Sequence, residues 1–193
     1  MTRFAPLPLR RTLATAGLGL LLLAPAAHAA ELQRVDPAAS RIAFTYKQMG
    51  VAMDGRFGKF DIDLAFDPAK PESGRTAIAI ELASIDAGSA EANDEVVGKA
   101  WFDAKAHPKA VFKSTGVKAL GGNRFEAQGT LTIKGRSQPV SAPFTFTPQG
   151  EAGIFDGSFV IRRADFAIGE GDWADFGIVA NEITVKFHVL AAR

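Results

Sequence analysis

Large apolar residues recur at every second position along most of this chain. In the segment FDIDLAF (60–66), four apolar side chains alternate with two aspartates and one alanine. Successive side chains of a strand point to opposite faces, so this spacing predicts strands with one apolar and one polar face. The same alternation returns in residues 42–46, 78–82, 125–133, 140–146, 155–161 and 183–189.

Turn-forming residues separate these segments, as in DPAKPESG (67–74), GGN (121–123), KGRSQP (134–139) and PQGEAG (148–153). One helix is predicted from Ala90 to Phe102, because acidic residues gather at its start, and a second short helical turn is predicted at Asp172–Phe176. So little helix cannot cover seven or more strands. The sheet must therefore bury its apolar face against itself, as a closed barrel or a two-sheet sandwich. The alternation alone does not separate these two architectures.

The first 30 residues have the order of parts of a secretory signal peptide. Basic residues stand at positions 3, 10 and 11, an apolar run of 12 residues follows at Leu13–Ala24, and Ala27-His28-Ala29 resembles a cleavage site. A membrane-spanning helix needs roughly 20 apolar residues, so a permanent anchor is not expected here. We expect an exported, periplasmic protein, with the general and the twin-arginine routes both open.

Residues 31–193 are expected to form a single domain. Three of the 22 basic residues and none of the 21 acidic ones lie in the first 30 positions, which leaves 19 basic and 21 acidic residues, a net charge of −2. No clustered basic face is evident, so nucleic acid is not an expected partner. The chain has no cysteine, which excludes disulfides and a lipid anchor on cysteine.

Few residues suggest catalysis or metal binding. Asp103 stands four residues before His107, which raises the alternative of an exported enzyme acting on a hydrophobic substrate. His188 shares the polar side of its strand and is expected to be a solvated surface residue. No nucleophile motif or metal-ligand spacing is present, and the acidic run GEGDWADFG (169–177) lacks the order of a calcium loop. We therefore predict no catalytic residue, no metal site and no resident cofactor.

Phenylalanine is abundant, with 15 residues in the chain, of which only Phe4 precedes residue 31. Most of them fall on the predicted apolar strand faces. Small residues are mixed among them, namely Ala127, Gly129 and Ala142. Two interpretations follow: a solid β-core, since aromatic residues favour strands, or a barrel of about eight strands with room for an apolar ligand.

Five segments in order resemble the YceI-like, polyisoprenoid-binding family of exported bacterial proteins. They are VDPAASRIAF (35–44), GRFGKFDIDLAFDP (55–68), SIDAGSAEANDEVVGKAWFDAKAHPKAVFKST (84–115), GTLTIKGRSQPV (129–140) and RADFAIGEGDW (163–173). The resemblance implies an all-β fold: an extended antiparallel lipocalin-like β-barrel of about eight strands with one or two short helices. It also implies a binding role in transport, storage or stress response, and no enzymatic one.

The expected ligand is an amphiphile with a long isoprenoid tail, such as a polyprenyl phosphate or a quinone, or a fatty-acid-like molecule. Transient contact with a membrane or membrane protein, and a homodimer, are compatible with this role. A ligand-free structural or stress protein with a solid barrel is the other alternative. The candidate ligand-binding residues are Phe44, Phe57, Phe60, Trp101, Phe102, Phe112, Leu131, Phe144, Phe146, Phe159 and Phe166.

Overall fold

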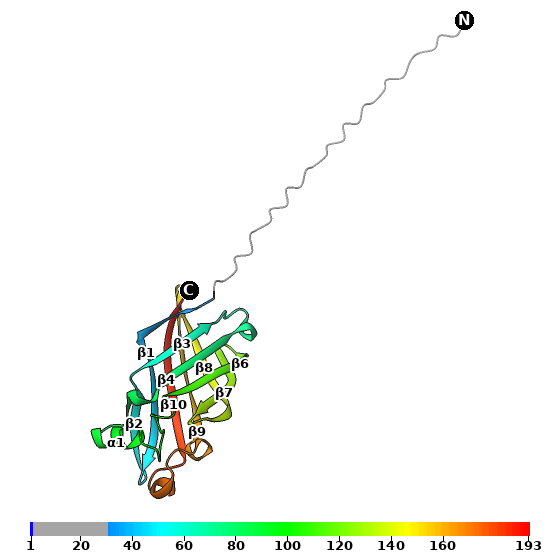
Figure 1. The fold of residues 1–193 in the computed structure, drawn as a ribbon. Helices are drawn as coiled ribbons and strands as arrows, with labels where there is room; N and C mark the ends of the chain where they lie inside the picture. Colours follow the sequence, from blue (N-terminus) through cyan, green and yellow to red (C-terminus); the bar gives the residue numbers. More distant parts are fainter. Residues whose placement is uncertain (2–30) are drawn as a thin grey trace.

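A computed structural model of the chain describes residue 1 and residues 31–193, so the signal-peptide prediction for residues 1–30 lies outside the described residues apart from Met1. Ten strands form one sheet in the order β3-β4-β6-β7-β8-β9-β10-β1-β2-β5 (Figure 1). The strands are β1 (Arg34–Gln48), β2 (Val51–Phe57), β3 (Phe60–Ala65), β4 (Arg75–Glu81), β5 (Ile85–Asp86), β6 (Lys109–Gly121), β7 (Arg124–Ile133), β8 (Arg136–Gln149), β9 (Ala152–Arg162) and β10 (Glu182–Ala192).

The sheet curls into a half-barrel in which all neighbouring strands are antiparallel. β2 pairs with β1, and β3, which follows after only two residues, pairs with β4 at the far edge of the strand order. Leu32 and Phe66 exchange two backbone hydrogen bonds of 2.9 and 3.1 Å, which join the segment before β1 to the end of β3. A single curled sheet confirms the barrel prediction over the two-sheet sandwich.

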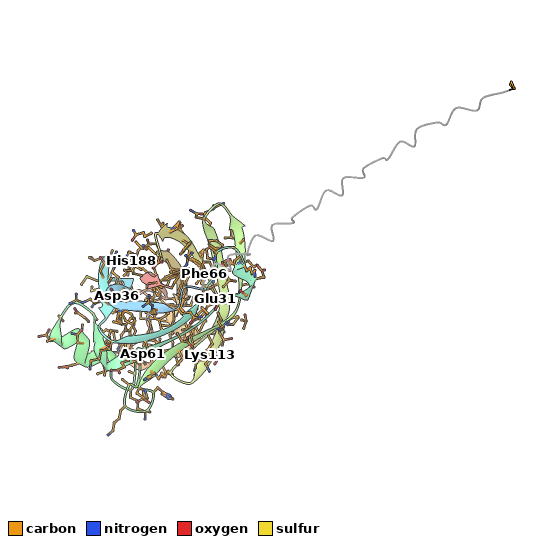
Figure 2. All side chains as sticks on the ribbon, turned by 90° about the horizontal axis from the view of Figure 1, so that it is seen from above. Glu31, Asp36, Asp61, Phe66, Lys113 and His188 are labelled. Carbon is orange, nitrogen blue, oxygen red and sulfur yellow. The ribbon has the colours of Figure 1, made fainter. Side chains whose placement is uncertain are left out.

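The alternation predicted from the sequence determines which residues face inward. In β7, Phe125, Ala127, Leu131 and Ile133 are buried, whereas Thr130 on the other face is exposed. β8 repeats the pattern beside it, with register pairs that include Phe125 with Phe144 and Ala127 with Ala142. Seen from above, Phe66 lies among the interior side chains of the barrel (Figure 2).

Helix is scarce, as predicted, but shorter than predicted. Helix α1 covers Ala90–Val96, capped by Ser89, whose Oγ accepts from the amide of Ala92 at 3.2 Å. The prediction of a helix up to Phe102 was wrong at this end: the backbone turns at Gly98 and takes a left-handed conformation at Asp103, with φ of 46°. Glycine is a weak helix former, which favours an early stop. Four 3-10 turns complete the secondary structure of residues 31–193: η1 (Pro71–Ser73), η2 (Leu82–Ser84), η3 (Arg163–Phe166) and η4 (Gly171–Ala174).

Helix α1 and the turns η3 and η4 lie at the end of the barrel opposite to the C-terminus (Figure 1). The turn η4 overlaps the short helical turn predicted at Asp172–Phe176. Among the described residues, no helix is both long and apolar enough to cross a bilayer.

Candidate functional site: an apolar cavity in the barrel

The curled sheet encloses a cavity of about 580 Å³, within the range of ligand sites in proteins. Its lining is almost entirely apolar and comes from both ends of the strand order, including Ile62 of β3 and Phe57 of β2. A cavity of this size contradicts the solid-barrel alternative. Interiors of close-packed domains contain few voids larger than a water molecule.

Eight of the eleven candidate ligand-binding residues line this cavity: Phe44, Phe57, Trp101, Phe102, Phe112, Leu131, Phe144 and Phe159. The remaining three are not in its lining. Phe146 and Phe166 are buried in the hydrophobic core, with 4% and 1% of their surface exposed. Phe60 is half-buried near the edge of the sheet, on the same face of β3 as the lining residues Ile62 and Leu64.

A cluster of phenylalanines fills the barrel at the end near the Leu32–Phe66 bridge. Phe66 packs edge-on against Phe125, Phe144, Phe146 and Phe155, with ring centroids 5.2 to 5.9 Å apart. Edge-to-face pairs at such distances add to the stability gained from burial. Phe146 therefore belongs to this packed cluster and does not border the cavity. Phe144 lies on the same face of β8 and packs in the same cluster, but it borders the cavity as well.

Glycines beneath aromatic rings help to keep the cavity open. A β-carbon at Gly129 would lie 2.6 Å from the ring of Phe112, and one at Gly157 would lie 2.8 Å from an edge atom of Phe187. Phe44 stands over Gly55 on the neighbouring strand in the same way. Because these rings cover neighbouring glycines, they extend along the sheet and leave space along the barrel axis.

Polar groups gather where the cavity meets α1. Its lining there includes Gln48, Ser89, Glu91 and Glu95. Trp173 Nε1 donates to Glu95 Oε1 at 2.7 Å. Hydrogen bonds from its own backbone amide and from Ser89 lower the pKa of Glu91, which favours the ionised form of this carboxyl group. We call this polar end of the cavity, lined by Gln48, Ser89, Glu91 and Glu95, its mouth.

Tyr46 closes one wall of this mouth. Its hydroxyl donates to the carbonyl of Ala87 at 3.0 Å, and burial raises the pKa of the phenol. Tyr46 was part of the alternating segment predicted at residues 42–46, but it was not among the candidate ligand-binding residues. Its place in the cavity lining follows from that alternation.

Arg163 organises the loop between β9 and β10 and is 1% exposed. Its Nε, Nη1 and Nη2 atoms contact six backbone carbonyls at 2.7 to 3.4 Å, those of Ile168, Gly169, Trp173, Asp175, Val179 and Ala180. The guanidinium carbon also lies 5.7 Å from the ring centre of Trp101. Burial lowers the pKa of this guanidinium. The sequence does not indicate this role of Arg163, because its carbonyl partners are 5 to 17 residues further along the chain.

Lys134 fastens the same loop to the hairpin between β7 and β8. Its Nζ donates to the carbonyl of Ala167 at 2.8 Å and to Glu170 Oε2 at 2.7 Å. In the acidic run 169–177, Glu170 is thus paired with a lysine, and Asp175 Oδ1 accepts from the amide of Gly177 at 2.7 Å. Both carboxylates thus make contacts that stabilise the loop itself.

The residues that suggested an enzyme do not form a side-chain pair. The contact between them is one of the backbone, in which the amide of His107 donates to the carbonyl of Asp103 at 2.8 Å. The solvated position predicted for His188 needs correction: it is half-buried, with Nδ1 2.7 Å from Asp156 Oδ1. The two residues face each other across β9 and β10, and cross-strand neighbours on one face lie close enough to pair.

Comparison with known proteins agrees with this architecture. The crystal structure of BcnA from Burkholderia cenocepacia superposes with a TM-score of 0.80 and 43% identity, over 82% of this chain and 99% of that one. A polyisoprenoid-binding domain from Saccharophagus degradans has the same fold, with a TM-score of 0.65 and 13% identity over 84% of this chain and 98% of that one. A relative described as a UPF0312 protein, from Azotobacter vinelandii, is 29% identical over 96% of this chain and 99% of its own length. The model of the YceI-like domain matches residues 33–191, and the chain belongs to the YceI-like family.

Proposed function

We propose that this protein binds a long-chain isoprenoid or a similar lipid in the barrel cavity. The observation that carries the proposal is the apolar cavity of about 580 Å³, which ends at a polar mouth beside α1. Moving apolar surface from water into such a cavity gains about 0.8 kcal/mol per methylene. The name of the Saccharophagus degradans domain, polyisoprenoid-binding, supports a ligand of this class.

The proposed role is to carry or store this lipid in the periplasm after export. The predicted signal peptide supports export. Transfer requires the mouth to meet a membrane, and exposed apolar side chains stand close to it: Met49 is 77% exposed, and its amide donates to the carbonyl of Ile178, which is 37% exposed. Met49 follows Gln48, which lines the cavity. This juxtaposition supports brief contact of the mouth with a lipid surface.

The test is to purify the protein, as its own host produces it, and to extract it with organic solvent. Mass spectrometry of the extract should recover prenyl or acyl lipids in amounts comparable to the protein. The stripped protein should then bind geranylgeraniol, a diterpene alcohol. Recovery of no such lipid, together with no binding of geranylgeraniol by the stripped protein, would refute the proposal.

A matched pair of variants shows whether the cavity holds the lipid. Ala127 lines the cavity, whereas Ala119, on the neighbouring strand β6, is exposed. Leucine at position 127 adds three carbons at the cavity wall, so we expect Ala127→Leu to reduce the volume left for a ligand and with it the recovered lipid. Ala119→Leu should leave the recovered lipid unchanged. An equal lipid content in both variants would place the lipid outside the barrel.

A further inference from the structure

Helix α1 borders the cavity without being packed into the barrel. It supplies Glu91, Ala92, Glu95 and Val96 to the cavity lining, and its N-cap Ser89 joins them. No residue of α1 is buried, and its apolar side chains Ala92 and Val96 are only partly covered. An element with few buried apolar contacts opens at a low free energy. The helix therefore covers the mouth of the cavity without a packed core to hold it there.

The chain on both sides of α1 is fixed more firmly than the helix itself. Ala87 before it is 4% exposed, and Trp101 after it is 8% exposed. Between Ala87 and α1, Gly88 has φ of 104°, a conformation that favours glycine. At the other end, the amide of Phe102 donates to the carbonyl of Val96 at 3.0 Å. Hinges form at such element ends, so the helix has a flexible connection at Gly88 and a pivot at its C-terminal end.

Two side-chain hydrogen bonds hold α1 over the cavity. Asn93 Oδ1 accepts from the amide of Ala87 at 2.6 Å, and Glu95 Oε1 accepts from Trp173 Nε1 at 2.7 Å. Trp173 belongs to the turn η4, which lies at the same end of the barrel as α1 (Figure 1), in the loop that Arg163 anchors. Glu95 and Trp173 both line the cavity. The bond between them therefore joins the helix to the anchored loop across the mouth.

We propose that α1 is a lid over the cavity and that the hydrogen bond between Glu95 and Trp173 is its latch. A ligand enters or leaves when this bond breaks and α1 swings away from η4. The inference rests on the proposed function and adds to it the route and the control of ligand exchange. The latch joins two protein side chains, so its loss weakens the closed state of the empty and of the loaded protein alike. Uptake and release should then both become faster, while the affinity stays the same.

The test measures the exchange of geranylgeraniol on the stripped protein by stopped-flow tryptophan fluorescence, since Trp101 and Trp173 both line the cavity. Glu95→Ala removes the latch and keeps both tryptophans. It should speed up uptake and release about fivefold each, as expected for the loss of one hydrogen bond, and should change Kd by less than about twofold. Asp94→Ala is the matched control, because Asp94 is an exposed acidic residue of the same helix that does not line the cavity. It should exchange the ligand at the wild-type rate.

Hydrogen exchange of a single amide, followed by NMR, gives a second readout that needs no ligand. Opening of α1 separates the amide of Ala87 from Asn93, so this amide should exchange about fivefold faster in Glu95→Ala than in wild type, and at the wild-type rate in Asp94→Ala. Equal rates in Glu95→Ala and Asp94→Ala, for the amide and for the ligand, would overturn the lid while leaving lipid binding intact. Faster release with unchanged uptake would mean that Glu95 binds the ligand itself, and would overturn the latch. Failure of geranylgeraniol to bind the wild-type protein would count against the proposed function, and the amide exchange alone would then support or overturn the lid.

Discussion

Replacing Arg163 by lysine tests whether one buried guanidinium holds the loop at the cavity mouth. The loop between β9 and β10 turns its carbonyls inward, and six of them lie 2.7 to 3.4 Å from the guanidinium nitrogens. One of these carbonyls, that of Asp175, also accepts from the amides of Ile178 and Val179. Lysine keeps the charge, but it has three N–H donors on one nitrogen in place of five on a planar fork.

At least two of the five remaining carbonyls then lose their donor. An unpaired buried polar group costs about 1–3 kcal/mol, so Arg163→Lys should destabilise the fold by about 3 kcal/mol. For a chain of this size, that loss corresponds to a fall in Tm of about 6–12 °C. The neighbouring Arg162 is exposed, and Arg162→Lys should change stability by less than about 0.5 kcal/mol.

Urea unfolding followed by tryptophan fluorescence measures both variants, since Trp173 lies in the loop and the ring of Trp101 lies beside Arg163. A stability of Arg163→Lys within about 0.5 kcal/mol of Arg162→Lys would refute the reasoning. It would mean that water reaches these carbonyls, and that the arginine does not organise the mouth.

Two further predictions concern the rim of the mouth. Lys134 lowers the pKa of Glu170 below its usual 4.5, by a hydrogen bond and by its charge, so the pair stabilises the fold above about pH 4.5 and loses this contribution as the pH falls through the lower folded-state value. Glu170→Gln should therefore be less stable than wild type near neutral pH, and urea titrations should show this difference shrinking as the pH falls through the lowered pKa of Glu170. A constant difference at every pH would contradict the ion pair. Met49→Ser should slow the transfer of geranylgeraniol between vesicles about threefold, because it removes an apolar group that would enter the lipid surface. Leu120→Ser, at an exposed hairpin remote from α1, should transfer at the wild-type rate, and equal rates for both variants would contradict docking through the mouth.

The strands could be predicted because their signal is local. The pleat sends alternate side chains to opposite faces, so the spacing of Phe125, Ala127 and Leu131 determines their burial without knowledge of the rest of the fold. The end of α1 was harder to predict. Val97 and Trp101 have the spacing of an apolar helix face, but the chain turns at Gly98 and delivers Trp101 to the cavity wall from a turn.

Which inward residues contact the cavity could not be predicted from alternation. Phe144 and Phe146 share one face of β8, yet Phe144 borders the cavity and Phe146 does not. Phe66, far away in the sequence, packs on both of them, and only the closure of the sheet brings it there. Arg163 shows the same limit, since a charged residue at a strand end gives no sign that a later loop will surround it with carbonyls.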